Sequence, residues 1–254
     1  MKARIFSIAL ATVSAAAIIA AGVAANGQTV GAVAAAAQVK VAEKAEDFRL
    51  VDQNSKTQLL SYYKNSPAID VAFQVHENHA EKLAHAFGLS HLRGPAFAVI
   101  WTTTPWTLPA NEAVSVHPEL TYDLIETEKG SLILVRELAE SALKRYELEG
   151  TAIGSCTGDK LDQILLKHPF QKRDVAIICG THVTTEAGTG LVHTAPAHGV
   201  DDYNIGKKYG LPVNTPVGND GRFISTTPAL SVGELAGKTV WEANPLVLQE
   251  LESH

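Results

Sequence analysis

From about residue 62 onward, short apolar segments alternate with clusters of glycine, proline and threonine, and this spacing limits the folds open to the chain. Examples are "GPAFAVIWTTTPWTLPAN", "TYDLIETEKGSLILVREL" and "DVAIICGTHVTTEAGTGLVHTAP". The first is typical of a buried strand that ends in a polar loop, the second of a hairpin turning at Lys129-Gly130, and the third of strands punctuated by glycines. Strands outnumber helices without regular strand–helix alternation, which predicts a compact α+β or β-barrel-like domain.

Three segments carry a helical pattern. "RELAESALKRYEL" has helical periodicity, and "HGVDDYNIGKKYG" is predicted to form a helix that ends at Gly210. "HENHAEKLAHAF" is consistent with a single helix or loop, whose histidines are spaced by three and six residues. A metal site would need closer facing pairs, so these histidines are expected on a solvated surface.

The first sixty residues differ from the rest. Residues 1–37 begin with Lys2 and Arg4, continue with an apolar Ala-rich run and reach small residues near Ala25, which is the pattern of a secretory signal peptide. A disordered or helical Ala-rich tail is the alternative. The run is only moderately apolar, so no stable membrane span is expected after signal removal. Residues 38–61 include "EDFRLVDQNSKTQLL", which resembles the opening hairpin of thioredoxin-fold peroxiredoxin-type proteins but lacks their reactive cysteine.

Charge and cysteine content narrow the function classes. The 254-residue chain has a net charge of −6, which argues against bulk electrostatic gripping of nucleic acid but leaves recognition of one end of a nucleic acid open. Cys156 and Cys179 form no CxxC pair, so both are expected to be structural.

The segment "GTGLVHTAPAHGVDDY" holds two histidines and two adjacent aspartates. A metal site is not favoured, because His193 and His198 are five residues apart with Pro196 between them and no HExxH pattern is present. A Ser/His/Asp triad is not favoured either, because neither Ser155 nor Ser225 lies in a GxSxG motif.

A small-molecule pocket fits this segment better. Gly188 and Gly190 permit a tight turn and a close approach to a ligand, and His193 follows at the end of a strand. Gly199 is expected to open a helix whose first turn carries Asp201 and Asp202. One carboxylate is expected to cap the helix and the other to bind a cation such as an ammonium group.

The second half of this pocket is expected to be "WTTTPWTLPAN", where three threonines offer hydroxyl groups before Pro105 stiffens the loop. A strand with a polar edge is the alternative for the threonines alone.

Taken together, "VIWTTTPWTLPAN" and "GTHVTTEAGTGLVHTAPAHGVDDYNIGKKYGLPVNTPVGNDGRF" closely resemble the editing domain of isoleucyl-tRNA synthetases, over residues 62–254. The Trp106-Thr107 pair favours the isoleucyl type over the valyl and leucyl types, which have Arg-Pro after the threonines. The resemblance implies hydrolysis of valyl-tRNA(Ile) at the 3′ end of the tRNA, without metal or cofactor, and no covalent enzyme nucleophile.

The resemblance also implies roles for individual residues. The catalytic set would be Thr102, Thr103 and Thr104 around the ester, Asp202 on the α-ammonium group, and His193 beside the side-chain pocket. Trp106 would shape the adenosine end. The rest of the substrate-binding set is Gly188, Gly190, His198 and Asp201. Ala197 stands where the family usually has glycine, so a positive φ there would strain the loop.

Other interpretations stay open at this stage. The chain contains no recognisable ATP-binding motif of this synthetase class, so aminoacylation is not expected. A folded but inactive remnant is one alternative, and a secreted redoxin-like protein is another. The family resemblance implies a cytoplasmic location, whereas the N-terminus predicts export. The sequence does not predict an oligomeric state.

Overall fold

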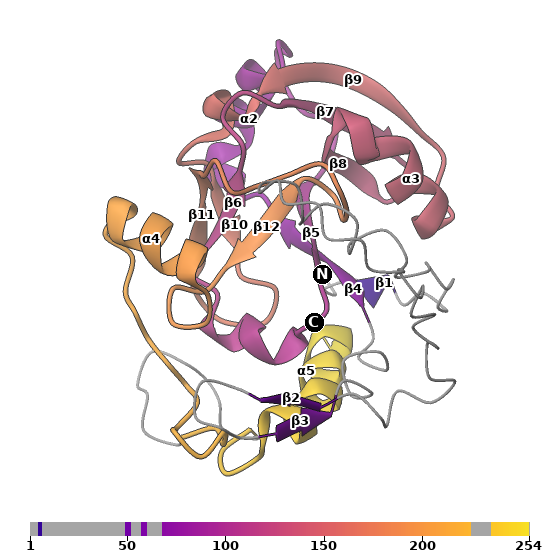
Figure 1. Ribbon diagram of the computed structural model, residues 1–254. Helices are drawn as coiled ribbons and strands as arrows, with labels where there is room; N and C mark the ends of the chain where they lie inside the picture. The colour runs from indigo at the N-terminus through magenta and orange to yellow at the C-terminus, as the bar shows by residue number, and fades with distance from the viewer. Residues whose placement is uncertain (1–4, 7–48, 52–56, 60–67, 225–234, 254) are drawn as a thin grey trace, which may run out of the picture. The chain divides into compact units, whose positions relative to one another are not determined.

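The buried strand predicted in "GPAFAVIW" lies in the interior of a mixed sheet in the computed structural model (Figure 1). The structure describes residues 5–6, 49–51, 57–59, 68–224 and 235–253. The chain divides into two compact units, one of residues 1–8 with 68–254 and one of residues 9–67.

Two sheets make up the larger unit. The first has the order β1-β4-β5-β8-β7-β9, formed by Ile5–Phe6, Ile69–Gln74, Ala96–Thr102, Gly130–Val135, Thr121–Thr127 and Gly150–Thr157. The second has the order β10-β11-β6-β12, formed by Leu165–Lys167, Asp174–Cys179, Ala113–Val116 and Leu191–Thr194. The β5–β8 and β11–β6 pairs are parallel, and the other pairs are antiparallel.

Short helices connect and cover these strands. The α-helices are α2 (Ala80–Ala86), α3 (Arg136–Tyr146), α4 (Val200–Tyr209) and α5 (Val240–Ser253), and the 3-10 helices are η2 (Glu77–His79), η3 (Pro105–Ala110) and η4 (Gly158–Leu161). None of the helices in the described residues combines the length and apolar character that crossing a bilayer requires.

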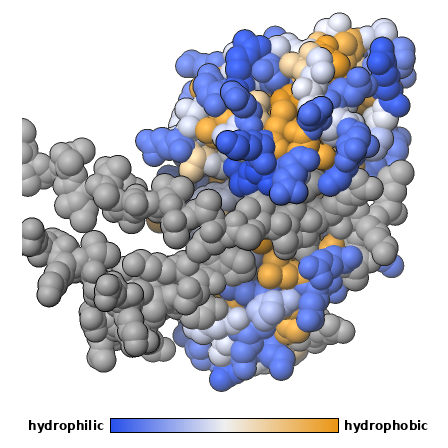
Figure 2. Space-filling model, turned by 90° about the vertical axis from the view of Figure 1, so that its right-hand side faces the viewer, coloured by the Kyte–Doolittle hydropathy of each residue, from blue (hydrophilic) through white to orange (hydrophobic). Residues whose placement is uncertain are grey.

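The two sheets share one core, as expected for a barrel-like α+β domain. In β5, Ala98 and Ile100 point into this core, whereas Val99 points to the opposite face and packs with α3. A bridge between Val75 and Leu166 links the end of β4 to β10, and β12 packs against β5. Hydrophilic residues cover most of the coloured surface in Figure 2, with apolar residues in a strip between them. The predicted fold class is therefore confirmed.

Local predictions agree with the structure at most turns. The hairpin turn lies between β7 and β8, where Gly130 has φ +114°, and α4 ends at Gly210 with φ +67°. The single helix considered for "HENHAEKLAHAF" is wrong, because the segment divides into η2 and α2. His79 lies at this division, where its Nδ1 accepts the Leu165 N–H of β10 at 3.1 Å.

In the smaller unit, β2 (Arg49–Val51) and β3 (Thr57–Leu59) form an antiparallel pair, with Arg49 opposite Leu59. The hairpin expected in "EDFRLVDQNSKTQLL" is therefore present. Apart from these strands and β1, the signal-peptide-like segment 1–37 and the redoxin-like segment 38–61 lie outside the described residues.

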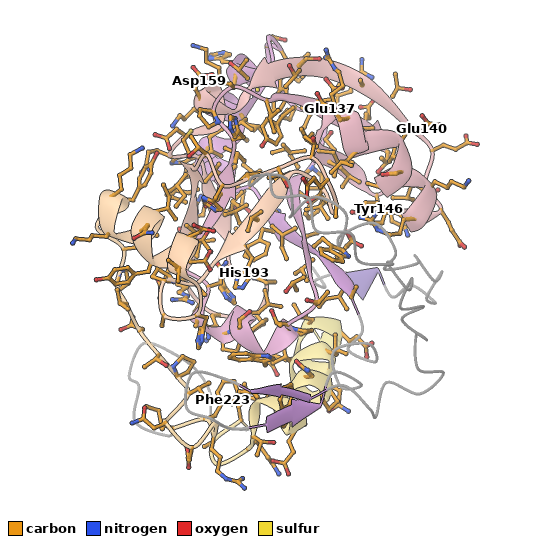
Figure 3. The ribbon with its side chains drawn as sticks, viewed as in Figure 1. Glu137, Glu140, Tyr146, Asp159, His193 and Phe223 are labelled. Atoms are coloured by element: carbon orange, nitrogen blue, oxygen red, sulfur yellow. The ribbon has the colours of Figure 1, made fainter. Side chains whose placement is uncertain are left out.

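A buried ion pair connects α3 to the larger sheet. Asp70 on β4 is 1% exposed, and it accepts hydrogen bonds from Arg145 Nε at 2.9 Å and Nη2 at 2.7 Å. Tyr146 Oη donates to the same carboxylate at 2.7 Å, and burial raises the pKa of this phenol so that it stays a donor. Figure 3 shows Tyr146 at the end of α3 nearest β4. A carboxylate buried this deeply is stable only while these donors remain.

Replacing Arg145 with methionine should therefore destabilise the fold by about 3 kcal/mol, because Asp70 would lose its buried partner. The matched control is Arg93→Met, because Arg93 and Glu126 are 3.7 Å apart with Arg93 81% exposed. An exposed ion pair of this kind contributes about 0–1 kcal/mol to the free energy of unfolding. Urea unfolding followed by circular dichroism measures both variants, and equal stability losses would contradict the assignment.

Candidate active site

The ends of two strands place the predicted loops next to each other. β5 ends at Thr102 and leads through η3 into β6, and β12 pairs with β6 so that His193 lies opposite Val114. His193 therefore faces the loop that follows β5. Figure 3 shows His193 near the centre of the larger unit, between β12 and that loop.

His193 is held by one residue on each side of its ring. Thr107 Oγ1 donates to the Thr104 carbonyl at 2.8 Å, so at 2.8 Å from His193 Nε2 it must accept that N–H. Asn111 Nδ2 donates both to the Ala113 carbonyl at 2.9 Å and to His193 Nδ1 at 2.9 Å. These bonds define the neutral Nε2–H tautomer.

Burial keeps His193 in this neutral form. It lowers the pKa of the imidazole to about 4, with a smaller contribution from His198. Both ring nitrogens already have partners, so His193 cannot take a proton from a water molecule without losing the Asn111 bond. The ring is consequently held in one orientation, with no free nitrogen to act as a general base.

The three threonines do not form one equivalent row. Thr102 is buried, and its Oγ1 accepts the Thr104 N–H at 3.0 Å, whereas Thr103 is exposed. Thr104 is half-buried at the N-terminus of η3, and its hydroxyl lies 3.3 Å from Thr102 Oγ1. Thr104 is thus linked to His193 through its carbonyl and Thr107, while its hydroxyl lies beside that of Thr102.

The loop between β12 and α4 is fixed by a carboxylate. Asp202 is half-buried, and its Oδ2 accepts the Ala195 N–H at 2.9 Å. Burial raises the pKa of Asp202, while the bond from Ala195 lowers it. Within the described residues the loop engages Oδ2, which leaves Oδ1 available to a cation. Asp201 is exposed on the same helix turn.

The two predicted halves of the pocket are in contact. The Trp106 and His198 rings lie 5.1 Å apart in an edge-to-face arrangement. His198 Nε2 and Asn111 Oδ1 are buried atoms without a hydrogen-bond partner in the described part of the chain. Such atoms are places where water or a ligand would bind. Ala197 has no positive φ, so the strain considered for this position does not arise.

Gly188 and Gly190 both have left-handed φ values, +83° and +76°, in agreement with the tight turn expected of them. Their carbonyls are held by the body of the domain. Arg145 Nη2 donates to the Gly188 carbonyl at 3.4 Å, and Tyr122 Oη donates to the Gly190 carbonyl at 2.7 Å. A Cβ on Gly190 would overlap the Val135 side chain. The close approach seen here is to neighbouring strands, and contact with a ligand stays a prediction.

Several residues that position the site were not found from the sequence. Three side chains of the β10–β11 turn hold three backbone carbonyls that follow Thr107. His168 donates to Leu108, Gln171 to Pro109, and Arg173 to Pro109 and Asn111. Burial lowers the pKa of His168 to about 3, so it too is neutral. From the sequence alone, "KHPFQKR" is typical of a polar surface turn. Its supporting role was not visible because its hydrogen-bond partners lie about sixty residues away in the chain.

Other chemistries find little support in this geometry. Ser155 donates to Asp123 at 2.6 Å and accepts from Arg136 at 2.8 Å, so it pairs with no histidine. Ser225 lies outside the described residues. No cluster of three or more His, Cys, Asp or Glu side chains that could hold a metal ion occurs in residues 68–224 and 235–253. Cys156 and Cys179 are both free thiols, and burial raises the pKa of each.

Comparison with known proteins agrees with this arrangement. Residues 94–237 match the family model described as "Leucyl-tRNA synthetase, editing domain". The chain is 91% identical over 190 residues to an isoleucine–tRNA ligase of Dechloromonas aromatica, and 56% identical over 191 residues to one of Neisseria meningitidis serogroup C. These matches cover 75% and 74% of this chain, which spans about a fifth of the length of either relative.

Solved structures show the same fold. A crystal structure titled GlLeuRS-CP1 matches with a TM-score of 0.56 and 15% identity, covering 72% of this chain and 94% of that one. The Plasmodium falciparum cytosolic leucyl-tRNA synthetase editing domain matches with a TM-score of 0.52 and 10% identity, covering 74% and 98%. At these identities, the likeness concerns the fold alone.

The neutral state of His193 makes stability depend on pH. Its pKa is lowered from 6.5 to about 4 on folding, so the unfolded chain binds more protons between these values and stability falls as the pH falls through this window. At pH 5, this group alone lowers the free energy of unfolding by about 2 kcal/mol relative to neutral pH. The melting temperature should therefore differ less between pH 7 and pH 5 for His193→Gln than for the parent chain, as measured by thermal unfolding.

The matched control for this measurement is His85→Gln, because His85 is exposed on α2. It should keep the pH dependence of the parent chain. An unchanged pH dependence in His193→Gln would show that His193 is not held neutral by burial.

Proposed function

Because the chain belongs to the family of leucyl-tRNA synthetase-type editing domains, we propose that it hydrolyses the ester bond of a mischarged aminoacyl-tRNA, with valyl-tRNA(Ile) as its substrate. The similarity to isoleucine–tRNA ligases supports tRNA(Ile) as the nucleic acid, and valine is proposed because it is one methylene smaller than isoleucine. The observation that supports it best is the His193 ring, fixed in one tautomer between Thr107 and Asn111 at the edge of the threonine loop.

A rigid wall is what discrimination by size requires. One methylene changes binding by only about 1–3 kcal/mol, so a pocket that admits isoleucine cannot reject valine efficiently. A second pocket that is too small for isoleucine can remove the error. A side chain free to change rotamer would not set such a limit, but His193 is held through both of its ring nitrogens.

Recognition of the amino group is assigned to Asp202. Its Oδ1 is directed to no partner among the described residues, while its Oδ2 is fixed by Ala195 N. A carboxylate anchored in this way needs no reorganisation when an ammonium group arrives, so little binding energy is lost. The tRNA 3′ end is thus the proposed partner, read at its terminal aminoacyl-adenosine with Trp106 at the adenosine side.

Hydrolysis then requires no covalent enzyme intermediate. A water molecule attacks the ester carbonyl carbon, the bond from that carbon to the ribose oxygen breaks, and the ribose oxygen takes up a proton. The products are valine and tRNA. The Thr104 hydroxyl and the terminal ribose hydroxyl orient the water, and the rate comes from positioning and electrostatics.

Selectivity is the first test. The whole chain, incubated with valyl-tRNA(Ile) and isoleucyl-tRNA(Ile), should hydrolyse the valyl ester about 10- to 200-fold faster. His193→Ala should raise the rate on isoleucyl-tRNA(Ile), because removal of the ring enlarges the pocket. Equal rates on both substrates with the parent chain, or no rate above buffer, would contradict the proposal. The second outcome would indicate a folded but inactive domain.

The role of Asp202 is tested separately with Asp202→Asn. The amide oxygen can still accept the Ala195 N–H, so the loop stays in place while the negative charge is lost. The value of kcat/KM on valyl-tRNA(Ile) should fall about 30-fold or more, as for other desolvated charge pairs. Asp201→Asn, one residue away and exposed, is the matched control and should leave the rate unchanged. The reverse pattern would assign the ammonium group to Asp201.

A further inference from the structure

The N-terminus of η3 is capped by a residue from another element. Thr104 is the N-cap of this helix and Pro105 is its first residue, so an ordinary cap would direct the Thr104 hydroxyl to the N–H of Trp106 or Thr107. The Thr104 side chain makes no such bond. Thr107 N donates instead to the Thr104 carbonyl at 3.0 Å.

The N–H of Trp106 is taken by Asn244. Its Oδ1 accepts this N–H at 3.1 Å, from a residue 138 positions along the chain. Asn244 lies on α5 and is 4% exposed. In Figure 1, α5, drawn in yellow, lies beside the loop that follows β5, in agreement with the contacts between α5 and η3.

The helix that carries Asn244 is itself well fixed. Thr239 and Glu242 form a capping box at its start, in which Thr239 N donates to Glu242 Oε2 at 2.8 Å and Glu242 N donates to Thr239 Oγ1 at 3.3 Å. One face of α5 then enters the shared core through Ala243, Val247 and Leu251. Asn244 is therefore a polar side chain on a rigid, buried helix face, and a buried amide of this kind needs a hydrogen-bond partner.

We infer that Asn244 is a positioning residue of the site: by capping η3 in place of Thr104, it keeps the Thr104 hydroxyl off the backbone of η3. The hydroxyl stays beside Thr102 Oγ1, at 3.3 Å, where a further hydrogen bond to the water or ester of the substrate can form. The inference rests on the proposed function, since that function requires a Thr104 hydroxyl that does not cap η3. The family match ends at residue 237, so Asn244 lies beyond the segment that the family model describes.

Without Asn244, the unpaired N–H of Trp106 would attract the nearest acceptor. That acceptor is the Thr104 hydroxyl, which can rotate into the usual capping position. The hydroxyl would then point to the backbone of η3, and the attacking water would lose its partner. The fold would be retained, because the exchange leaves no donor unsatisfied.

The test compares three variants in the whole chain. Asn244→Leu has a similar volume and no acceptor, Asn244→Asp keeps the acceptor, and Val247→Ala loosens the same helix face without touching Trp106. On valyl-tRNA(Ile), Asn244→Leu should lower kcat about 10- to 100-fold and change KM less than about threefold. Asn244→Asp should restore kcat. Val247→Ala should lower the melting temperature while kcat remains at the parent value.

A crystal structure of Asn244→Leu provides the second measurement. Thr104 Oγ1 should move to hydrogen-bonding distance of Trp106 N. A parent-like kcat in Asn244→Leu, or an unmoved Thr104 hydroxyl in its crystal structure, would overturn the inference. If the parent chain hydrolyses no aminoacyl-tRNA, the proposed function fails, and the crystal structure still decides whether Asn244 is the cap of η3.

Discussion

The hydrogen bonds on the two sides of the His193 ring are the constraint on which the site depends. Thr107 can accept from Nε2 only because its own proton is given to the Thr104 carbonyl, and Asn111 can donate to Nδ1 only because its amide is oriented by the Ala113 carbonyl. The tautomer and the ring orientation follow from this short network, and burial lowers the pKa of His193. A histidine held in this way contributes a fixed ring surface to the site and does not exchange protons.

The backbone beneath the site is held by residues that are distant in the sequence. The β10–β11 turn supports the end of η3 through His168, Gln171 and Arg173. Asn244 supports the start of the same helix, and Tyr122 and Arg145 support the glycine turn before β12. Loops usually move more than the elements they connect. Here the start and end of η3 and the glycine turn before β12 are each held by side chains from other elements, which restrains these loops.

Much of this arrangement could be predicted from local sequence. Strand and turn chemistry indicated the α+β class, the hairpin at Lys129-Gly130 and the end of α4 at Gly210, because these features depend on side chains within a few residues of each other. The family resemblance indicated which two loops meet. The pairing partners of His193 lay inside the quoted threonine segment, but nothing local distinguishes Thr107 from Thr103 or Asn111 from a turn asparagine. Nothing local in "HENHAEKLAHAF" indicates that His79 accepts the Leu165 N–H of β10 at the division of this segment.

The sequence by itself therefore determined the element types, the tight turn at Gly188 and Gly190, and the identity of the residues available for chemistry. These depend on backbone sterics and on periodicity, which act over short stretches of chain. Only the tertiary structure decided the protonation state of His193, the oxygen of Asp202 that remains open, and the residue that caps η3. Each of these depends on burial and on hydrogen-bond partners contributed by other elements, and a donor 138 residues away from its acceptor leaves no mark on either local sequence.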